Sequence, residues 1–88
     1  MAPRPAPGYW MHETSGALRP AVEAYLRRKE MSLLHIAALR AYLRQWINRG
    51  EWKGPAVEGL RRAVDSIRSR DDIQAWLETA LEAGIDPL

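Results

Sequence analysis

The chain has no cysteine, no phenylalanine and only two histidines. Without cysteine it can form no disulfide, no thiolate nucleophile and no zinc site built on thiolates. Two histidines without cysteine do not predict a dedicated zinc site either. We therefore expect no metal site, and the lack of disulfides favours a reducing compartment such as the cytoplasm.

Long apolar segments are also missing. No stretch approaches the roughly 18 apolar residues of a membrane-spanning helix, so we expect no membrane association. Residues 1–8 carry alternating prolines, whereas a signal peptide needs a continuous apolar segment. Because Pro3, Pro5 and Pro7 prevent helix formation, we interpret residues 1–8 as a disordered proline-rich leader of a cytoplasmic protein.

The motifs of catalysis and cofactor binding are absent from the sequence. A Ser–His–acid triad would have to use His12 or His35, and sequence neighbours alone do not supply triad geometry. Gly50 and Gly54 lack the strand-to-helix frame and the GK[ST] signature of a phosphate-binding loop. We expect a hydrogen-bonded packing or capping role for His12 and, for His35, a position at the edge of an apolar stripe. We expect no catalytic residue, no cofactor, and hence no enzyme.

What the chain does contain is enough for one small core. Its 88 residues, 47% of them hydrophobic, predict a single globular domain over residues 9–88, monomeric or weakly dimeric. The net charge of +2 is unevenly distributed along the chain. Residues 1–54 hold nine Lys or Arg and four Asp or Glu, whereas residues 55–88 hold four Arg and seven acids. The first half therefore favours a negatively charged partner.

Apolar residues recur at helical spacing in four segments, and no strand-like alternation occurs. The first helix is expected from about Ser15 or Arg19 to Arg28, and the second from a Ser32 cap to Arg49, with Gly50 as its stop. These segments predict an all-α fold, a compact four-helix bundle with the second helix at its centre. An irregular N-terminal arm with two adjacent aromatics, Tyr9 and Trp10, precedes the helices.

The last two helices have clear boundary signals. Pro55 suits the first turn of the third helix, and Ser69 with Asp72 resembles a capping box that opens the fourth. Gly84 is expected to end the fourth helix, whose core face includes Leu81. The predicted core contains the larger residues of the apolar stripes: Leu26, Ile36, Leu39, Leu43, Trp46, Leu60, Val64, Ile73, Trp76 and Leu77.

Aromatic usage supplies the first functional candidate. There are four tryptophans and three tyrosines, and Trp46 and Trp76 fall within helical stripes, as core residues do. Trp52 instead lies between two glycines in a non-helical segment, flanked by Glu51 and Lys53. Because tryptophan and arginine are enriched in interaction hot spots, we predict Trp52 as a partner contact. The alternative is that Trp52 covers the core as a loop aromatic.

The basic residues of the first half complete a predicted partner-binding surface. Its members, with Trp52, are Arg27, Arg28, Arg40, Arg44 and Lys53. The leading hypothesis is a non-catalytic protein-interaction module, and the alternative is weakly specific nucleic-acid binding through the basic half. A helix-turn-helix is disfavoured because the fourth helix, which would enter the groove, carries four acidic residues.

Three stretches of the chain resemble known sequences: YWMHETSG followed by LRPAVEAYL, then LRAYLRQWI, and finally AWLETALEAGIDPL. They are similar to a group of short bacterial proteins from phage and other mobile-element gene neighbourhoods, for which no activity is established. The resemblance implies a small accessory protein that binds and modulates, for example inhibits, a host protein or a defence complex. It assigns no role to any individual residue.

Overall fold

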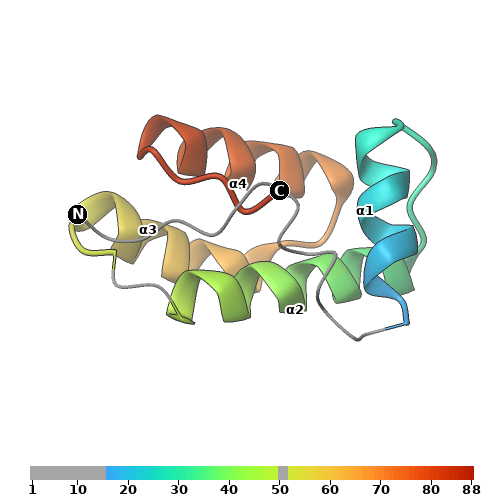
Figure 1. Ribbon diagram of the computed structural model, residues 1–88, viewed down its shortest axis with the longest axis horizontal. Helices are drawn as coiled ribbons and strands as arrows, with labels where there is room; N and C mark the ends of the chain where they lie inside the picture. Colours follow the sequence, from blue (N-terminus) through green and yellow to red (C-terminus); the bar gives the residue numbers. More distant parts are fainter. Residues whose placement is uncertain (1–15, 50–51) are drawn as a thin grey trace.

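The computed structural model describes residues 16–49 and 52–88, which form four α-helices and one 3₁₀ turn (Figure 1). In chain order these are α1 (Leu18–Leu26), α2 (Leu33–Arg49), α3 (Pro55–Ala63), the 3₁₀ turn η2 (Val64–Ser66) and α4 (Arg70–Glu82). These two ranges contain no strand, and the prediction of an all-α fold with four helices is confirmed. The leader of residues 1–8, the aromatic arm, His12 and the stop at Gly50 lie outside the described residues.

The helices are arranged around α2. Figure 1 shows α2, α3 and α4 running along the long axis of the molecule, whereas α1 lies across the end of α2. α2 contacts α1, α3 and η2, in agreement with its predicted central position. It also contributes six buried side chains to the core, namely Ile36, Leu39, Tyr42, Leu43, Trp46 and Ile47.

The helices begin where their local signals predict. The Ser32 hydroxyl accepts a hydrogen bond from the His35 backbone N–H at 3.1 Å and caps α2. The Ser69 hydroxyl caps α4 in the same way, accepting from the Asp72 N–H at 3.2 Å. The Asp72 carboxylate accepts from the N–H of Arg68 at 2.8 Å, one residue before the position used in a full capping box.

The end of α4 also follows its sequence signal. Gly84 has a φ of 79°, a left-handed conformation that glycine adopts without the steric cost of a Cβ. The Ile85 N–H donates to the Ala80 carbonyl at 2.8 Å, and the Gly84 N–H donates to Leu81 at 2.9 Å. This pair of bonds is a Schellman motif, and it turns the chain so that Ile85 is buried against the core.

Two buried hydrogen bonds then fix the tertiary arrangement. The indole N–H of Trp76 on α4 donates to the Leu60 carbonyl on α3 at 3.0 Å. The Tyr42 hydroxyl on α2 donates to the Pro87 carbonyl at 2.7 Å. Through this bond the C-terminal segment, which turns back along α4 in Figure 1, is held against the central helix.

Nine of the ten predicted core residues are buried, but the prediction for Leu26 is wrong. Leu26 is 56% exposed because α1 uses a different face from the one expected. Its buried residues include Ala21 and Ala24, whose small side chains allow close packing on α2. At 100° per residue, Leu26 then lies roughly 110° from the centre of the buried face.

Candidate functional site

A cleft of about 580 Å³ lies between the end of α1, the length of α4 and the C-terminal segment. Tyr25 and Leu26 line it from α1, with Arg28 directly after them. Leu77 and Leu81 line it from α4. Of all the lining residues only Leu77 is buried, so the cleft is a concavity in the surface and not an enclosed cavity.

Two exposed leucines face this cleft from elements far apart in the sequence. Leu26 is 56% exposed and Leu81 is 59% exposed, although Leu81 was expected on the core face of its helix. The buried face of α4 is centred near Ile73 and Ala80, and Leu81 lies about 90° from that centre. No local signal in the sequence identifies this pair, because packing in the tertiary structure selects which face of each helix is buried.

Arg70 joins α4 to α1 across the same cleft. Its Nη1 donates to the carbonyl of Lys29 at 2.7 Å and to that of Ala24 at 3.3 Å, and its Nη2 donates to the carbonyl of Tyr25. The guanidinium carbon also lies 5.0 Å from the centroid of the Tyr25 ring. Carbonyls at a helix end carry partial negative charge, which a cation stabilises.

Sequence reasoning overlooked Arg70, yet a signal was present. It is the first residue of α4, where the helix dipole favours an anion and disfavours a cation. A cation in that position therefore indicates a stabilising partner elsewhere in the fold. The partner is the carboxyl end of α1, which α4 meets only in the tertiary structure.

The chain leaves α1 through a left-handed residue that is not glycine. Arg28 has a φ of 56°, and its N–H donates to the Tyr25 carbonyl at 3.2 Å, while the Lys29 N–H donates to Ala24 at 2.9 Å. This is the bonding pattern of a Schellman motif with arginine in the place where glycine is common. A Cβ in this conformation costs about 1–2 kcal/mol.

The remaining lining of the cleft is polar apart from the half-buried Leu88. Asp71 and Glu78 on α4 and Asp86 on the C-terminal segment line it, and all three are exposed. Burial raises the pKa of the Tyr25 hydroxyl above its ordinary value of 10.0, the Arg70 cation opposes this shift, and the Glu78 carboxylate adds to it. The phenol is therefore neutral at physiological pH.

The predicted partner residues on α2 lie on another part of the surface. Arg44 is exposed, with its Nε 3.6 Å from Oδ1 of Asp65. Arg40 is half-buried, and its Nη1 donates to the Ile67 carbonyl at 2.9 Å. Arg40 and Arg44 line a second cavity of about 470 Å³ along α2, so the structure does bring these two arginines together.

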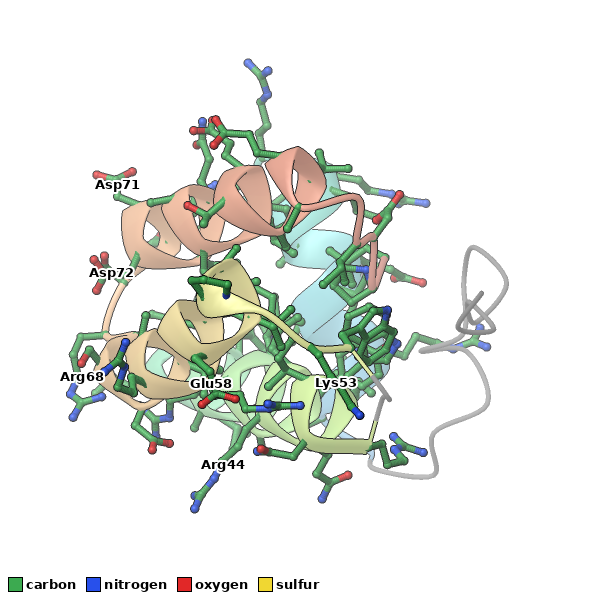
Figure 2. The ribbon with its side chains drawn as sticks, turned by 90° about the vertical axis from the view of Figure 1, so that its left-hand side faces the viewer. Arg44, Lys53, Glu58, Arg68, Asp71 and Asp72 are labelled. Carbon is green, nitrogen blue, oxygen red and sulfur yellow. The ribbon has the colours of Figure 1, made fainter. Side chains whose placement is uncertain are left out.

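Trp52 lies against the core. It is half-buried and stacks on Trp46, with 4.3 Å between ring centroids and 29° between ring planes. Its backbone carbonyl accepts a hydrogen bond from Nη2 of Arg61 at 3.2 Å. These contacts agree with the alternative in which Trp52 covers the core. In Figure 2 the neighbouring Lys53 and the more distant Arg44 extend in different directions from different elements.

The predicted partner-binding residues thus fall into three groups. Those groups are Arg27 with Arg28 after α1, Arg40 with Arg44 on α2, and Trp52 with Lys53 before α3. Only Arg28 lines the α1–α4 cleft. A third concavity of about 410 Å³, between α3 and α4, is lined by small residues such as Gly59, Ala63 and Ala75.

Within residues 16–49 and 52–88, no group of three His, Asp or Glu is placed to hold a metal ion. None of the helices described in these ranges is long and apolar enough to cross a membrane. Comparisons with protein-family models, with curated proteins and with solved structures found no match to this chain.

Proposed function

We propose that the chain is a non-catalytic protein-interaction module and that the α1–α4 cleft is its docking surface. The observation that carries this proposal is the pair Leu26 and Leu81, both more than half exposed and both lining one cleft. A fully buried leucine side chain contributes about 1.5–3 kcal/mol relative to an exposed one. A partner that covers both leucines recovers a large part of that free energy.

The shape of the cleft supports a macromolecular partner over a small ligand. Small-molecule sites usually bury most of the ligand surface in an enclosed pocket. Here the lining residues are exposed or half-exposed apart from Leu77, so a small molecule would remain largely in water. An apolar floor with charged residues around it is instead the usual anatomy of a protein interface.

The roles of particular polar residues support the non-catalytic part of the proposal. The backbone N–H of His35 donates to the Ser32 hydroxyl, and its Nδ1 lies 3.4 Å from the Ser32 backbone nitrogen as an acceptor. The backbone N–H and the Nδ1 atom of His35 therefore both contact the residue that caps α2. His35 is half-buried, as expected for a residue at the edge of an apolar stripe, and its contacts with Ser32 need no chemical role to explain them.

Intramolecular contacts of the arginines favour a protein partner over nucleic acid. Within the predicted basic half, Nη1 of Arg40 donates to the Ile67 carbonyl at 2.9 Å, and Nε of Arg44 lies 3.6 Å from Oδ1 of Asp65. A guanidinium held by the protein's own acceptors is less available to a phosphate backbone.

From the resemblance to mobile-element proteins, we propose a cytoplasmic host protein as the partner and a monomer or weak dimer as the free state.

A tagged pull-down from bacterial lysate, treated with nuclease, tests this proposal. The wild-type chain is compared with Leu26→Gln/Leu81→Gln, and with Leu34→Gln as the matched control. Leu34 is 65% exposed and lies outside the cleft, so its replacement makes the same chemical change on another surface. Circular dichroism first establishes that all variants keep the wild-type helical signal.

We expect one stoichiometric protein to be retained by the wild-type chain and by Leu34→Gln, and to be lost with the double variant. Equal capture by all three chains would show that the cleft is not the docking surface. Recovery of nucleic acid alone, with proteins lost after nuclease treatment, would instead support binding through the basic half. That binding would weaken steeply with added salt.

A further inference from the structure

Negative charge lines the α1–α4 cleft along α4 and the C-terminal segment, on the side of Leu81. The carboxylates of Asp71, Glu78 and Asp86 line it, and none of them forms an ion pair with a cation in the described part of the chain. Glu78 Oε1 accepts from the amide of Gln74 at 3.1 Å, and Asp86 Oδ1 accepts from the Leu88 N–H at 3.2 Å. Both donors are neutral, so they do not offset the charge of the carboxylates that they contact.

The two cations of the cleft do not cancel this charge along α4. The three Arg70 hydrogen bonds to the carbonyls that end α1 direct its guanidinium toward that helix. Arg28 follows α1, so it belongs to the same side of the cleft. The α4 side therefore presents Asp71 and Glu78 with no basic lining residue between them in the helix.

The spacing of these acids follows the repeat of an α-helix. Asp71 and Glu78 are seven residues apart in α4, which places them on one face of the helix and about 10.5 Å apart along its axis. Leu81 follows Glu78 by three residues, so it adjoins the same face. Figure 2 shows Asp71 extending outward from the start of α4. A helix that lies along α4 can match both carboxylates with cations that are themselves seven residues apart.

We propose that the α1–α4 cleft binds a basic amphipathic helix, whose apolar side chains cover Leu26 and Leu81 and whose lysines or arginines pair with Asp71 and Glu78. This inference rests on the proposed docking role of the cleft and specifies the chemistry of the partner. Docking of an amphipathic helix into an apolar groove is a recurring mode of recognition. An acidic helix is rejected by the like charge of the same carboxylates.

Binding of two synthetic helical peptides, measured by fluorescence anisotropy, tests the inference. Both peptides are about 18 residues long, a length that supports helix formation, and both have one leucine face. They differ only in carrying lysine or glutamate at the flanking positions. Four forms of the protein are compared: wild type, Asp71→Asn/Glu78→Gln, Leu26→Gln/Leu81→Gln, and the control Glu58→Gln/Asp65→Asn. The control makes the same change in net charge at acids outside the cleft.

We expect the lysine peptide to bind the wild type and the control equally, and at least about tenfold more tightly than the glutamate peptide. The variant lacking the charges of Asp71 and Glu78 should bind the lysine peptide about tenfold more weakly. Equal loss in the control would show that only overall charge matters, which would overturn the inference. So would retained binding in the leucine variant, because the apolar contact would then be unnecessary.

The failure of this inference is distinguishable from failure of the docking proposal. If both peptides bind equally and both are lost with the leucine variant, the cleft is a docking surface without preference for a basic helix. If neither peptide binds while the lysate partner still depends on the leucines, the inference is again overturned and docking stands. Sedimentation that shows a wild-type dimer and a monomeric leucine variant would identify a second copy of the chain as the occupant and overturn the basic helix.

Discussion

Replacing Arg70 by alanine tests how α1 is held to the body of the protein. Apart from its packing on α2, α1 is attached through the hydrogen bonds of Arg70 to the carbonyls of Ala24, Tyr25 and Lys29. Those carbonyls end a helix, and two of them already accept one backbone N–H each. Their remaining lone pairs are available to the guanidinium.

The expected loss can be estimated from the individual contacts. We assign about 1 kcal/mol to each of the hydrogen bonds that Arg70 donates to Lys29 and Tyr25, since water in the open cleft replaces part of each bond. The cation–π contact with Tyr25 adds about 0.5 kcal/mol. A cation in the first turn of α4 is unfavourable for the helix dipole, so its removal stabilises the chain by about 0.5 kcal/mol and offsets the lost cation–π contact. Arg70→Ala should therefore lower the free energy of unfolding by about 2 kcal/mol.

Thermal unfolding followed by circular dichroism measures this loss. For a domain of this size, about 2 kcal/mol corresponds to a fall in Tm of roughly 8–16 °C. Arg70→Lys should recover less than half of the loss, because one ammonium cannot reproduce the planar fork that reaches several carbonyls. Arg62→Ala is the matched control, since Arg62 is exposed on α3, and it should change stability by less than about 0.5 kcal/mol.

A small effect would refute this account of Arg70. If Arg70→Ala unfolded within about 2 °C of the Arg62→Ala control, the bridge would contribute nothing beyond an ordinary surface arginine. Full recovery with Arg70→Lys would show that charge alone, and not the geometry of the guanidinium, holds α1. Either result would mean that apolar packing on α2, and not the hydrogen-bond geometry of Arg70, holds α1 in place.

Three further substitutions follow from the same part of the fold and its surroundings. Arg28→Gly should raise the free energy of unfolding by about 1 kcal/mol in urea titrations, because glycine removes the Cβ strain at a φ of 56°. Gly59→Ala should raise it by about 0.5–1 kcal/mol by the same measurement, because a Cβ there meets no atom within 4 Å. Tyr25→Phe should make stability less sensitive to alkali, as melts between roughly pH 9 and 11 would show. Because the folded pKa of Tyr25 is raised, its stabilising contribution is present below the ordinary value of 10.0 and is lost as pH rises through the folded pKa.

Each of these expectations has an opposite outcome. A less stable Arg28→Gly chain would mean that the arginine side chain makes a contact worth more than the backbone strain. A less stable Gly59→Ala chain would mean that α3 and α4 pack too closely around Gly59 to accept a Cβ. Identical alkaline profiles for Tyr25→Phe and the wild type would mean that the phenol is solvated in both states.

Local signals in the sequence were sufficient for α2, α3 and α4, whereas α1 ends at Leu26, two residues before the predicted end at Arg28. The hydroxyls of Ser32 and Ser69 accept from backbone N–H groups three residues later in the chain. At the end of α4, the N–H groups of Gly84 and Ile85 donate to carbonyls three and five residues earlier. Such interactions involve only neighbours in the chain, so their residue types and spacing predict them. The buried stripe of α3 continues into η2 through Val64 for the same reason: helical periodicity is a local property.

The candidate site depended on contacts that no local pattern contains. Leu26 is exposed because α1 packs on α2 through the face that carries Ala21 and Ala24. Which face is buried depends on how the two helices cross, and the sequence of α1 alone does not contain that information. Trp52 stacks on Trp46 of α2 only in the tertiary structure. The cleft itself exists because α4 meets the end of α1, where Arg70 supplies the hydrogen bonds between residues more than forty positions apart. Helix boundaries were therefore set by near neighbours, whereas the surface that we propose for binding was decided by how the finished helices pack.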